Sequence, residues 1–165
     1  MTTTAARAAS IRPVRTSLTR IVAAGLAGGA VDFVYASTLG VLAGRGVARV
    51  WQGVAAGWLG EPAFEGGAAT APLGIVTHFA IAVAMAAAYA LAAARFGILY
   101  RRWALFAPLY GLVLYGVMYR VVLPLRWPGA GAWRGPESLL DVAAHIGVAV
   151  VAVFVLRRAS PLTEH

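Results

Sequence analysis

Four long apolar stretches alternate with short polar segments that carry most of the arginines. Each stretch is close to the roughly 20 residues that a helix needs to cross a bilayer. Arg, Gly or Pro stands at most of their ends, as is typical where a helix leaves the membrane or stops. The pattern predicts an all-α membrane protein, a four-helix transmembrane bundle with helices over about 21–43, 72–94, 103–123 and 138–156.

A shorter apolar pattern lies between the first two long stretches. Its apolar positions recur at helical spacing: Val47, Val50, Trp51, Val54 and Trp58. Tryptophan favours the boundary between membrane and water. We therefore expect residues 47–59 to form a short periplasmic helix that lies on the bilayer surface or enters it as a re-entrant turn.

Composition agrees with a membrane protein. Hydrophobic residues make up 61% of the chain and charged residues 12%, whereas soluble domains carry about 25% charge. The length of 165 residues fits one domain. We expect a single transmembrane domain over 21–158, between an Arg-rich cytoplasmic tail at 1–20 and a short cytoplasmic tail at 159–165. The absence of Cys excludes disulfides and thiolate metal sites.

The arginines predict the orientation. With four crossings, nine arginines fall on the side of the two termini and the 95–102 loop, and four fall on the other side. Positive charge favours the cytoplasm, so we expect both termini to be cytoplasmic. All 14 basic residues are Arg, and with abundant Ala and Gly this is typical of a GC-rich bacterial genome, which indicates the bacterial inner membrane.

The net charge of +8 fits a lipid bilayer as the partner. Binding to nucleic acid is not expected, because that function needs a basic stripe with interleaved aromatic residues. The Gly- and Ala-rich helix faces leave a homo-oligomer or a larger membrane complex open.

Ionisable residues within the predicted helices fall at the centre or in the periplasmic half. Asp32 is the only charge in residues 21–44, about 18 Å from the periplasmic end of its helix at 1.5 Å per residue. A carboxylate at that depth is costly and is rarely kept without a partner or a function. The sequence thus predicts a polar intramembrane site made of Asp32, His78, Arg120, Asp141, His145 and Glu65.

Within this set, Asp141 and His145 are four residues apart and share a helix face. A carboxylate one turn away can orient an imidazole and fix its tautomer. Arg120 lies at a similar depth, and we expect it to pair with Asp141. Packing is the alternative interpretation: the Arg120–Asp141 pair would join two helices, and His78 and His145 would be ordinary interhelical hydrogen-bonding residues.

Three functions are compatible with these residues. The first is a proton or small-solute site. The second is haem held by His78 and His145, which lie at matching depths on different helices. The third is a divalent metal held by His78, Asp141 and His145, with Glu65 as a further candidate. We predict no cofactor, because two separate histidines and no compact ligand motif are a weak signal.

No catalytic residue is assigned. The sequence has no G-x-S-x-G motif and no Gly-rich phosphate loop, so we predict a non-enzymatic protein. The expected function is that of a small multi-pass inner-membrane protein with a polar ionisable site in its periplasmic half, related to proton, pH or envelope-stress physiology. A haem- or metal-binding subunit and a structural partner of a larger membrane complex are the alternatives.

The second half of the chain carries a family resemblance. The residues on which it rests are Thr77-His78, Tyr89, Trp103, Pro124-Leu125, Ser138, His145 and Arg157-Arg158. On these residues, the span 77–158 resembles the YagU-type family of poorly characterised bacterial inner-membrane proteins. The resemblance implies an inner-membrane location without an established enzymatic activity. It also implies that His78 and His145 are the positions of interest, and it supplies no substrate.

Overall fold

The computed structural model describes residues 16–158, and this part of the chain is helical throughout, without strands. Four helical segments in it are long and apolar enough to cross a membrane. They are α1 (Leu18–Leu42), η1 with α4 (Gly67–Thr70, Ala71–Arg95), α6 through α7 (Trp103–Arg126) and α8 (Pro136–Arg157). The predicted all-helical fold with four helices of membrane-spanning length and hydropathy is confirmed, and the helix bounds agree to within a few residues.

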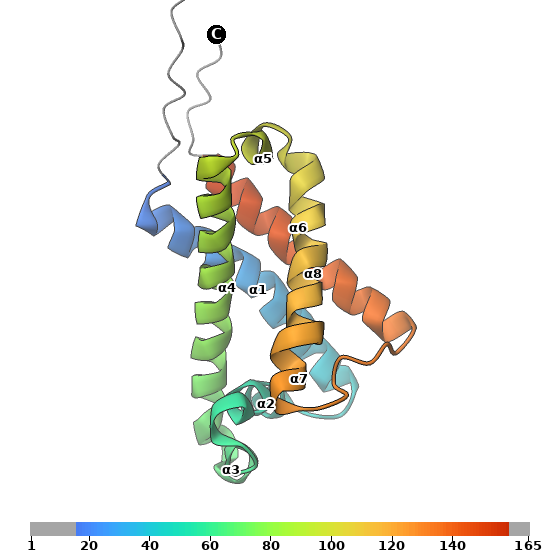
Figure 1. Cartoon of the computed structure of the whole chain (residues 1–165). Helices are drawn as coiled ribbons and strands as arrows, with labels where there is room; N and C mark the ends of the chain where they lie inside the picture. The colour runs from blue at the N-terminus through green and yellow to red at the C-terminus, as the bar shows by residue number, and fades with distance from the viewer. Residues whose placement is uncertain (1–15, 159–165) are drawn as a thin grey trace, which may run out of the picture.

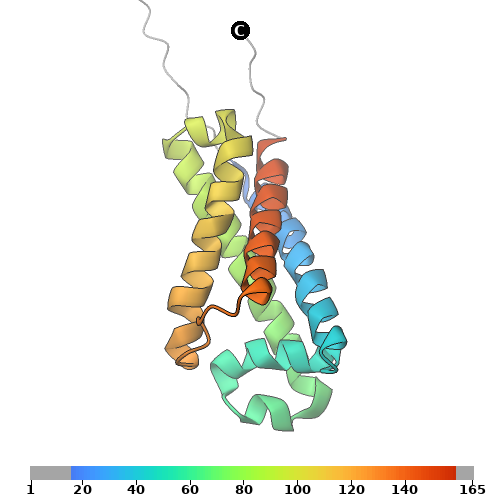
Figure 2. The ribbon, with the colours of Figure 1, turned by 90° about the vertical axis from the view of Figure 1, so that its right-hand side faces the viewer.

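Short helices close the two ends of the bundle. At one end lie α2 (Val47–Leu59), as predicted, and the single turn α3 (Pro62–Glu65), and at the other lies α5 (Ile98–Arg101). Figures 1 and 2 show α5 at the same end as the start of α1 and the end of α8. The predicted tails lie mostly outside the described residues, although α1 already begins at Leu18.

The long helices pack in the order α4–α1–α8–α6, so that α1 and α8 form the inner contacts. Figure 1 shows α4 and α6 standing side by side in front of α1 and α8. Near the α5 end they are joined by Tyr110, whose hydroxyl donates to the Met85 carbonyl at 2.8 Å. Toward α2 this contact between α4 and α6 gives way to the cavities described below.

Glycines set how closely α1 approaches its neighbours. A Cβ added at Gly25 would lie 2.4 Å from Val83 Cα on α4, and one added at Gly28 would lie 2.9 Å from the Val148 carbonyl oxygen on α8. Both contacts are too short for any larger residue. The small residues of α1 therefore face α4 and α8, as is typical of closely packed membrane helices.

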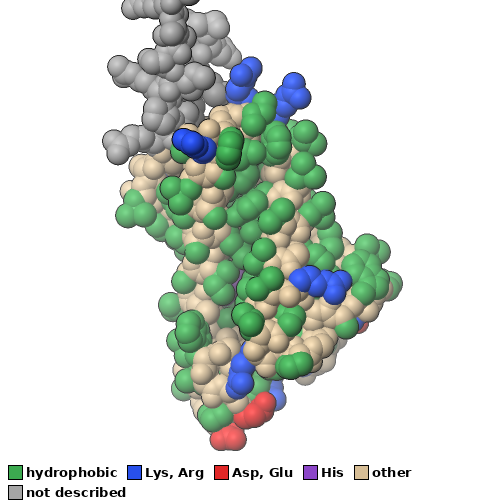
Figure 3. All heavy atoms as spheres, in the orientation of Figure 1, with side chains coloured by type: hydrophobic (Ala, Val, Ile, Leu, Met, Phe, Trp, Pro, Cys, Tyr) green, Lys and Arg blue, Asp and Glu red, His purple; other side chains and the backbone are tan. Residues whose placement is uncertain are grey.

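Large apolar side chains cover the outside of the bundle. Val34, Leu91 and Leu105 are each more than half exposed, and in Figure 3 the face over α4 and α6 is mostly hydrophobic. Such a surface would be a liability in water but suits contact with lipid chains. The buried interior, by contrast, is made largely of Ala, with few large side chains.

The third long segment departs from the uninterrupted helix that we predicted. After α6 (Trp103–Val117) the chain makes a π-helical turn at Met118–Val122, designated η2, and then continues as α7 (Leu123–Arg126). Pro124 lacks an amide hydrogen, and its ring would collide with the carbonyl four residues earlier in a regular helix. The wider π turn precedes Pro124 and accommodates its ring. The helical segment therefore continues to Arg126, beyond the end that we predicted at residue 123.

Candidate functional site

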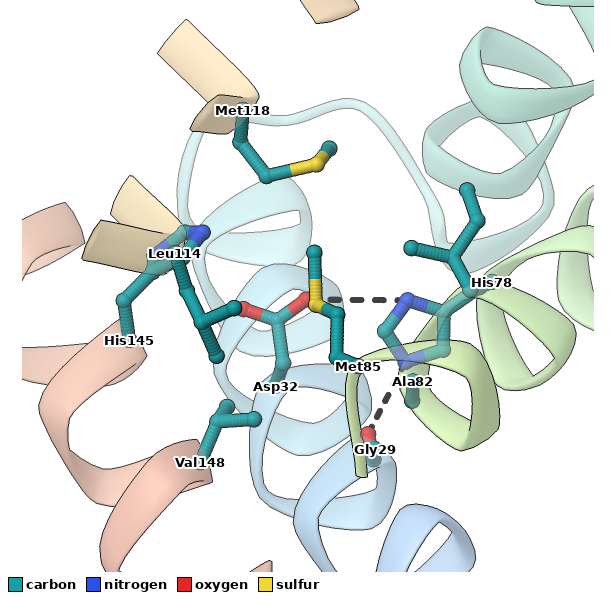
Figure 4. Close-up of a pocket in the computed structure, with 10 residues that line it drawn as sticks. Gly29, Asp32, His78, Ala82, Met85, Leu114, Met118, His145 and Val148 are labelled. Carbon is teal, nitrogen blue, oxygen red and sulfur yellow. Dashed lines mark hydrogen bonds and ion pairs between the residues drawn. The ribbon is translucent and has the colours of Figure 1, made fainter. Parts of the chain in front are cut away.

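Asp32 of α1 and His78 of α4 face each other in the middle of the bundle. Asp32 Oδ2 lies 3.7 Å from His78 Nδ1, which is within ion-pair range, and the two side chains are 26% and 13% exposed. On the other side of the ring, His78 Nε2 lies 2.9 Å from the Gly29 carbonyl oxygen. Figure 4 shows both contacts. The sequence predicted these two residues for one site, and the structure brings them together.

The Gly29 carbonyl determines the protonation of this pair. A carbonyl oxygen only accepts, so His78 Nε2 must carry a hydrogen. A neutral imidazole has one N–H, which leaves Nδ1 as a bare acceptor directed at the Asp32 carboxylate. The two groups become complementary when one proton is added, as imidazolium with carboxylate or as imidazole with carboxylic acid. The geometry is therefore suited to holding one proton between α1 and α4.

His145 of α8 lies on the opposite side of Asp32, as Figure 4 shows. Its Nδ1 donates to the Asp141 backbone carbonyl at 2.8 Å, so Nε2 is the nitrogen left to accept or to bind a proton. The edges of Tyr115 and Tyr119 pack around the ring, with centroids 5.8 and 5.9 Å away. A cavity of about 50 Å³ joins Asp32, His78 and His145.

Asp141 of α8 is the most buried carboxylate in the described chain, with its side chain 8% exposed. It accepts a hydrogen bond from the Tyr35 hydroxyl at 2.8 Å and one from Arg134 Nη2 at 3.2 Å. The structure therefore corrects the partner that we predicted, because Asp141 pairs with Arg134 and not with Arg120.

Arg120 is exposed and forms no ion pair within residues 16–158. It lies in the π turn, where the additional residue changes the helical phase that a regular 3.6-residue count assumes. Glu65, at the end of α3, is also exposed and is not among the described residues that line the cavities. These two residues fall outside the site, and the other four predicted residues surround it.

A larger hollow, here called the vestibule, connects the site to the α2 end. It has a volume of about 580 Å³ and shares Asp32, His145 and Met118 with the smaller cavity. Its remaining polar lining consists of Tyr35, Arg45, Arg49, Tyr119, Arg134 and Asp141. A hollow of this size with several polar groups in its lining has room for water, and it leads from Asp32 to the α2 end of the bundle.

Trp51 of α2 packs against His78 behind the site, and its position corrects another expectation. We predicted it for the membrane surface, but it is 1% exposed. Its ring stacks on Phe33 with centroids 4.5 Å apart and packs against His78 at 5.0 Å, and its Nε1 donates to Ser37 Oγ at 3.1 Å. Only Trp58 of the pair is largely exposed, at 72%.

The geometry does not favour the cofactors that we considered. Within residues 16–158, no group of three or more His, Asp or Glu side chains is arranged to hold a metal ion. The Asp141 carboxylate is already bound by Tyr35 and Arg134. For haem, both ring nitrogens of His78 face other groups, Gly29 and Asp32, so neither is directed at an open space where an iron ion could bind.

Comparison of the chain with protein-family models, with curated proteins and with solved structures finds no match. The resemblance to the YagU-type family stays a prediction. Any function has to be argued from the chemistry of the site itself.

Proposed function

We propose that this chain is a non-enzymatic protein of the bacterial inner membrane that binds and exchanges a proton at the Asp32–His78 pair, and so responds to the pH of the compartment at its α2 end. The observation that carries the proposal is the hydrogen bond between His78 Nε2 and the Gly29 carbonyl. Because this bond keeps the imidazole hydrogen on Nε2, Nδ1 and the Asp32 carboxylate are both acceptors that face each other. They become complementary only when a proton lies between them. Histidine is suited to this role because it titrates near neutral pH.

The surroundings of the pair support exchange rather than permanent burial of the proton. The charged and titratable groups around Asp32 come from every neighbouring element: His78 on α4, His145 and Asp141 on α8, Tyr119 on η2, Arg45 and Arg49 at the α2 end, and Arg134 before α8. Ionisable residues that face a water-filled cavity inside a membrane are typical of proton pathways. A residue used only for packing would need no such connection.

The same proposal includes an orientation. Nine arginines on the side of the termini against four on the α2 side favour cytoplasmic termini, with α2 and the vestibule facing the periplasm. A reporter that is active only in the periplasm should be inactive when fused after His165 and active when inserted at 128–132. The reverse result in a blue–white alkaline phosphatase assay would contradict the orientation.

Trp51 provides a direct test of proton binding, because its ring contacts His78 and a nearby positive charge interacts with an indole. We expect the tryptophan fluorescence of the protein in proteoliposomes to change in a single step as the pH is varied. His78→Gln should abolish the change, and so should Trp51→Phe. Trp58→Phe is the matched control, because Trp58 lies on the same helix and is exposed, and it should leave the titration intact.

The side of access is tested in the same vesicles with buffers that do not cross the membrane. The titration should follow the pH on the α2 side. An unchanged titration in His78→Gln would show that the signal arises elsewhere, and the proton site would then be reduced to a packing contact.

A further inference from the structure

A second hollow opens beside the vestibule on the surface between α2, α4 and the η2–α7 segment. This groove has a volume of about 550 Å³, within the range of roughly 300–1,000 Å³ that is usual for small-molecule sites. Its lining is mostly apolar and includes Val54, Trp58, Ile81, Val122, Leu125 and Trp127, with Thr77 and Arg126 as its polar residues. The groove lies beside two of the segments that are long and apolar enough to cross a membrane, Gly67–Arg95 and Trp103–Arg126.

The groove and the vestibule adjoin each other. They share five lining residues: Val50, Gly53, Val54, Met118 and Leu123. A molecule that extends across both meets mostly apolar side chains in the groove and arginines in the vestibule. That division of chemistry is complementary to an amphiphile with an anionic head.

The arginines in the vestibule differ in their partners. Arg134 is bound to Asp141 at 3.2 Å. Arg45 and Arg49 form no ion pair within residues 16–158, and the Arg49 guanidinium lies over the Phe64 ring at 4.0 Å from its centroid. The two carboxylates that line the vestibule, Asp32 and Asp141, face His78 and Arg134. Two exposed guanidinium groups are therefore available to an external anion.

We infer that this hollow binds one anionic phospholipid from the leaflet at the α2 end, with an acyl chain in the groove and the phosphate at Arg45 and Arg49. Arginine is the preferred partner of phosphate, because its planar group donates two parallel hydrogen bonds. Tryptophans at the rim of the groove, Trp58 and Trp127, suit the level of the lipid headgroups. The inference goes beyond the proposed function: Arg45, Arg49 and the groove make no contact with the proton pair itself, although the two arginines line the same vestibule as Asp32.

Native mass spectrometry of the detergent-purified protein tests this inference, with phosphatidylglycerol and phosphatidylcholine of identical acyl chains. We expect one tightly retained phosphatidylglycerol and weaker binding of phosphatidylcholine. The double variant Arg45→Gln/Arg49→Gln should weaken phosphatidylglycerol binding roughly 30-fold. This is the combined effect of two basic residues, each of which usually contributes about 1 kcal/mol near a lipid headgroup. Arg101→Gln/Arg102→Gln removes the same charge at the α5 end and should change the affinity by less than about twofold.

The apolar half is tested separately by filling the groove. Gly53 lines both hollows, and a Cβ added there meets no atom within 4 Å, so Gly53→Trp should fold and exclude the acyl chain. Gly116→Trp is the matched control, because its Cβ position is equally open and it is not among the lining residues. We expect loss of bound lipid in the first variant and retention in the second.

Three outcomes would overturn the inference. Equal retention of the two lipids would show that binding does not depend on the charge of the headgroup. Equal losses in the two double-arginine variants would indicate a general effect of net charge. Binding of soluble glycerol phosphate as tightly as phosphatidylglycerol, unaffected by Gly53→Trp, would reveal a site for a free anion and no role for the groove.

Discussion

Arg134→Ala should lower the free energy of unfolding by about 2 kcal/mol, because a buried charged group loses one of its partners, while Arg134 itself is 54% exposed. The reason is the position of Asp141, whose side chain is 8% exposed. Without the guanidinium, the carboxylate would keep the Tyr35 hydroxyl but no opposite charge. The measurement is reversible unfolding in mixed micelles, with helix content followed by circular dichroism.

Arg120→Ala is the matched control, because Arg120 is exposed and lies outside the site. It should change the free energy of unfolding by no more than about 0.5 kcal/mol. Adding Asp141→Asn to Arg134→Ala should cost less than the sum of the two single changes, since the pair is then removed together. A larger loss in Arg120→Ala than in Arg134→Ala would restore the pair that the sequence predicted.

Arg120 and Arg134 show what sequence reasoning could and could not reach. The depth of a residue follows from counting along a helix, because each residue adds about 1.5 Å. Counting placed His78 and His145 at matching depths and Asp32 deeper in the membrane, and the structure brings all three to one cavity. The direction in which a side chain points depends on helical phase. The π turn at Met118–Val122 changes that phase, and from the sequence we interpreted Pro124 only as the end of the helix and not as the cause of such a turn.

Arg134 was missed for a different reason. It lies in the connection before α8, seven residues ahead of Asp141, so no regular spacing relates the two. Tyr35 was within reach of a pattern, because it stands three residues after Asp32 on α1 and so shares its side of the helix.

The fold itself could be predicted well because the bilayer leaves few choices. A chain that crosses lipid must satisfy its backbone hydrogen bonds internally, so long apolar stretches become helices. The same argument does not cover α2. Its bounds followed from the spacing of Val47, Val50 and Trp51, but that spacing shows only that one face is apolar. Whether that face contacts lipid or protein depends on how the helix packs. Trp51 is buried and packs beside Phe33 and His78.

The Asp32–His78 pair yields the most specific prediction, which concerns the two ring nitrogens of His78. Nitrogen-15 NMR of histidine-labelled protein should show Nε2 carrying a hydrogen at every pH, because the Gly29 carbonyl accepts from it. Nδ1 should show a hydrogen shared with Asp32 at low pH. As the pH rises through the titration, Nδ1 should take the chemical shift of a bare imidazole nitrogen.

Asp32→Asn separates a shared proton from a simple packing contact. The amide that it introduces has the shape of the carboxylate and can donate to Nδ1, so the contact is complete with a neutral imidazole. Nδ1 should then stay bare across the range in which the wild-type protein titrates, while folding is unchanged. His145 is the internal control, because its Nδ1 donates to the Asp141 backbone and does not depend on the Asp32 carboxylate for that bond. If Nδ1 of His78 titrates identically in Asp32→Asn, the carboxylate does not share the proton, and the proposed site loses its chemical basis.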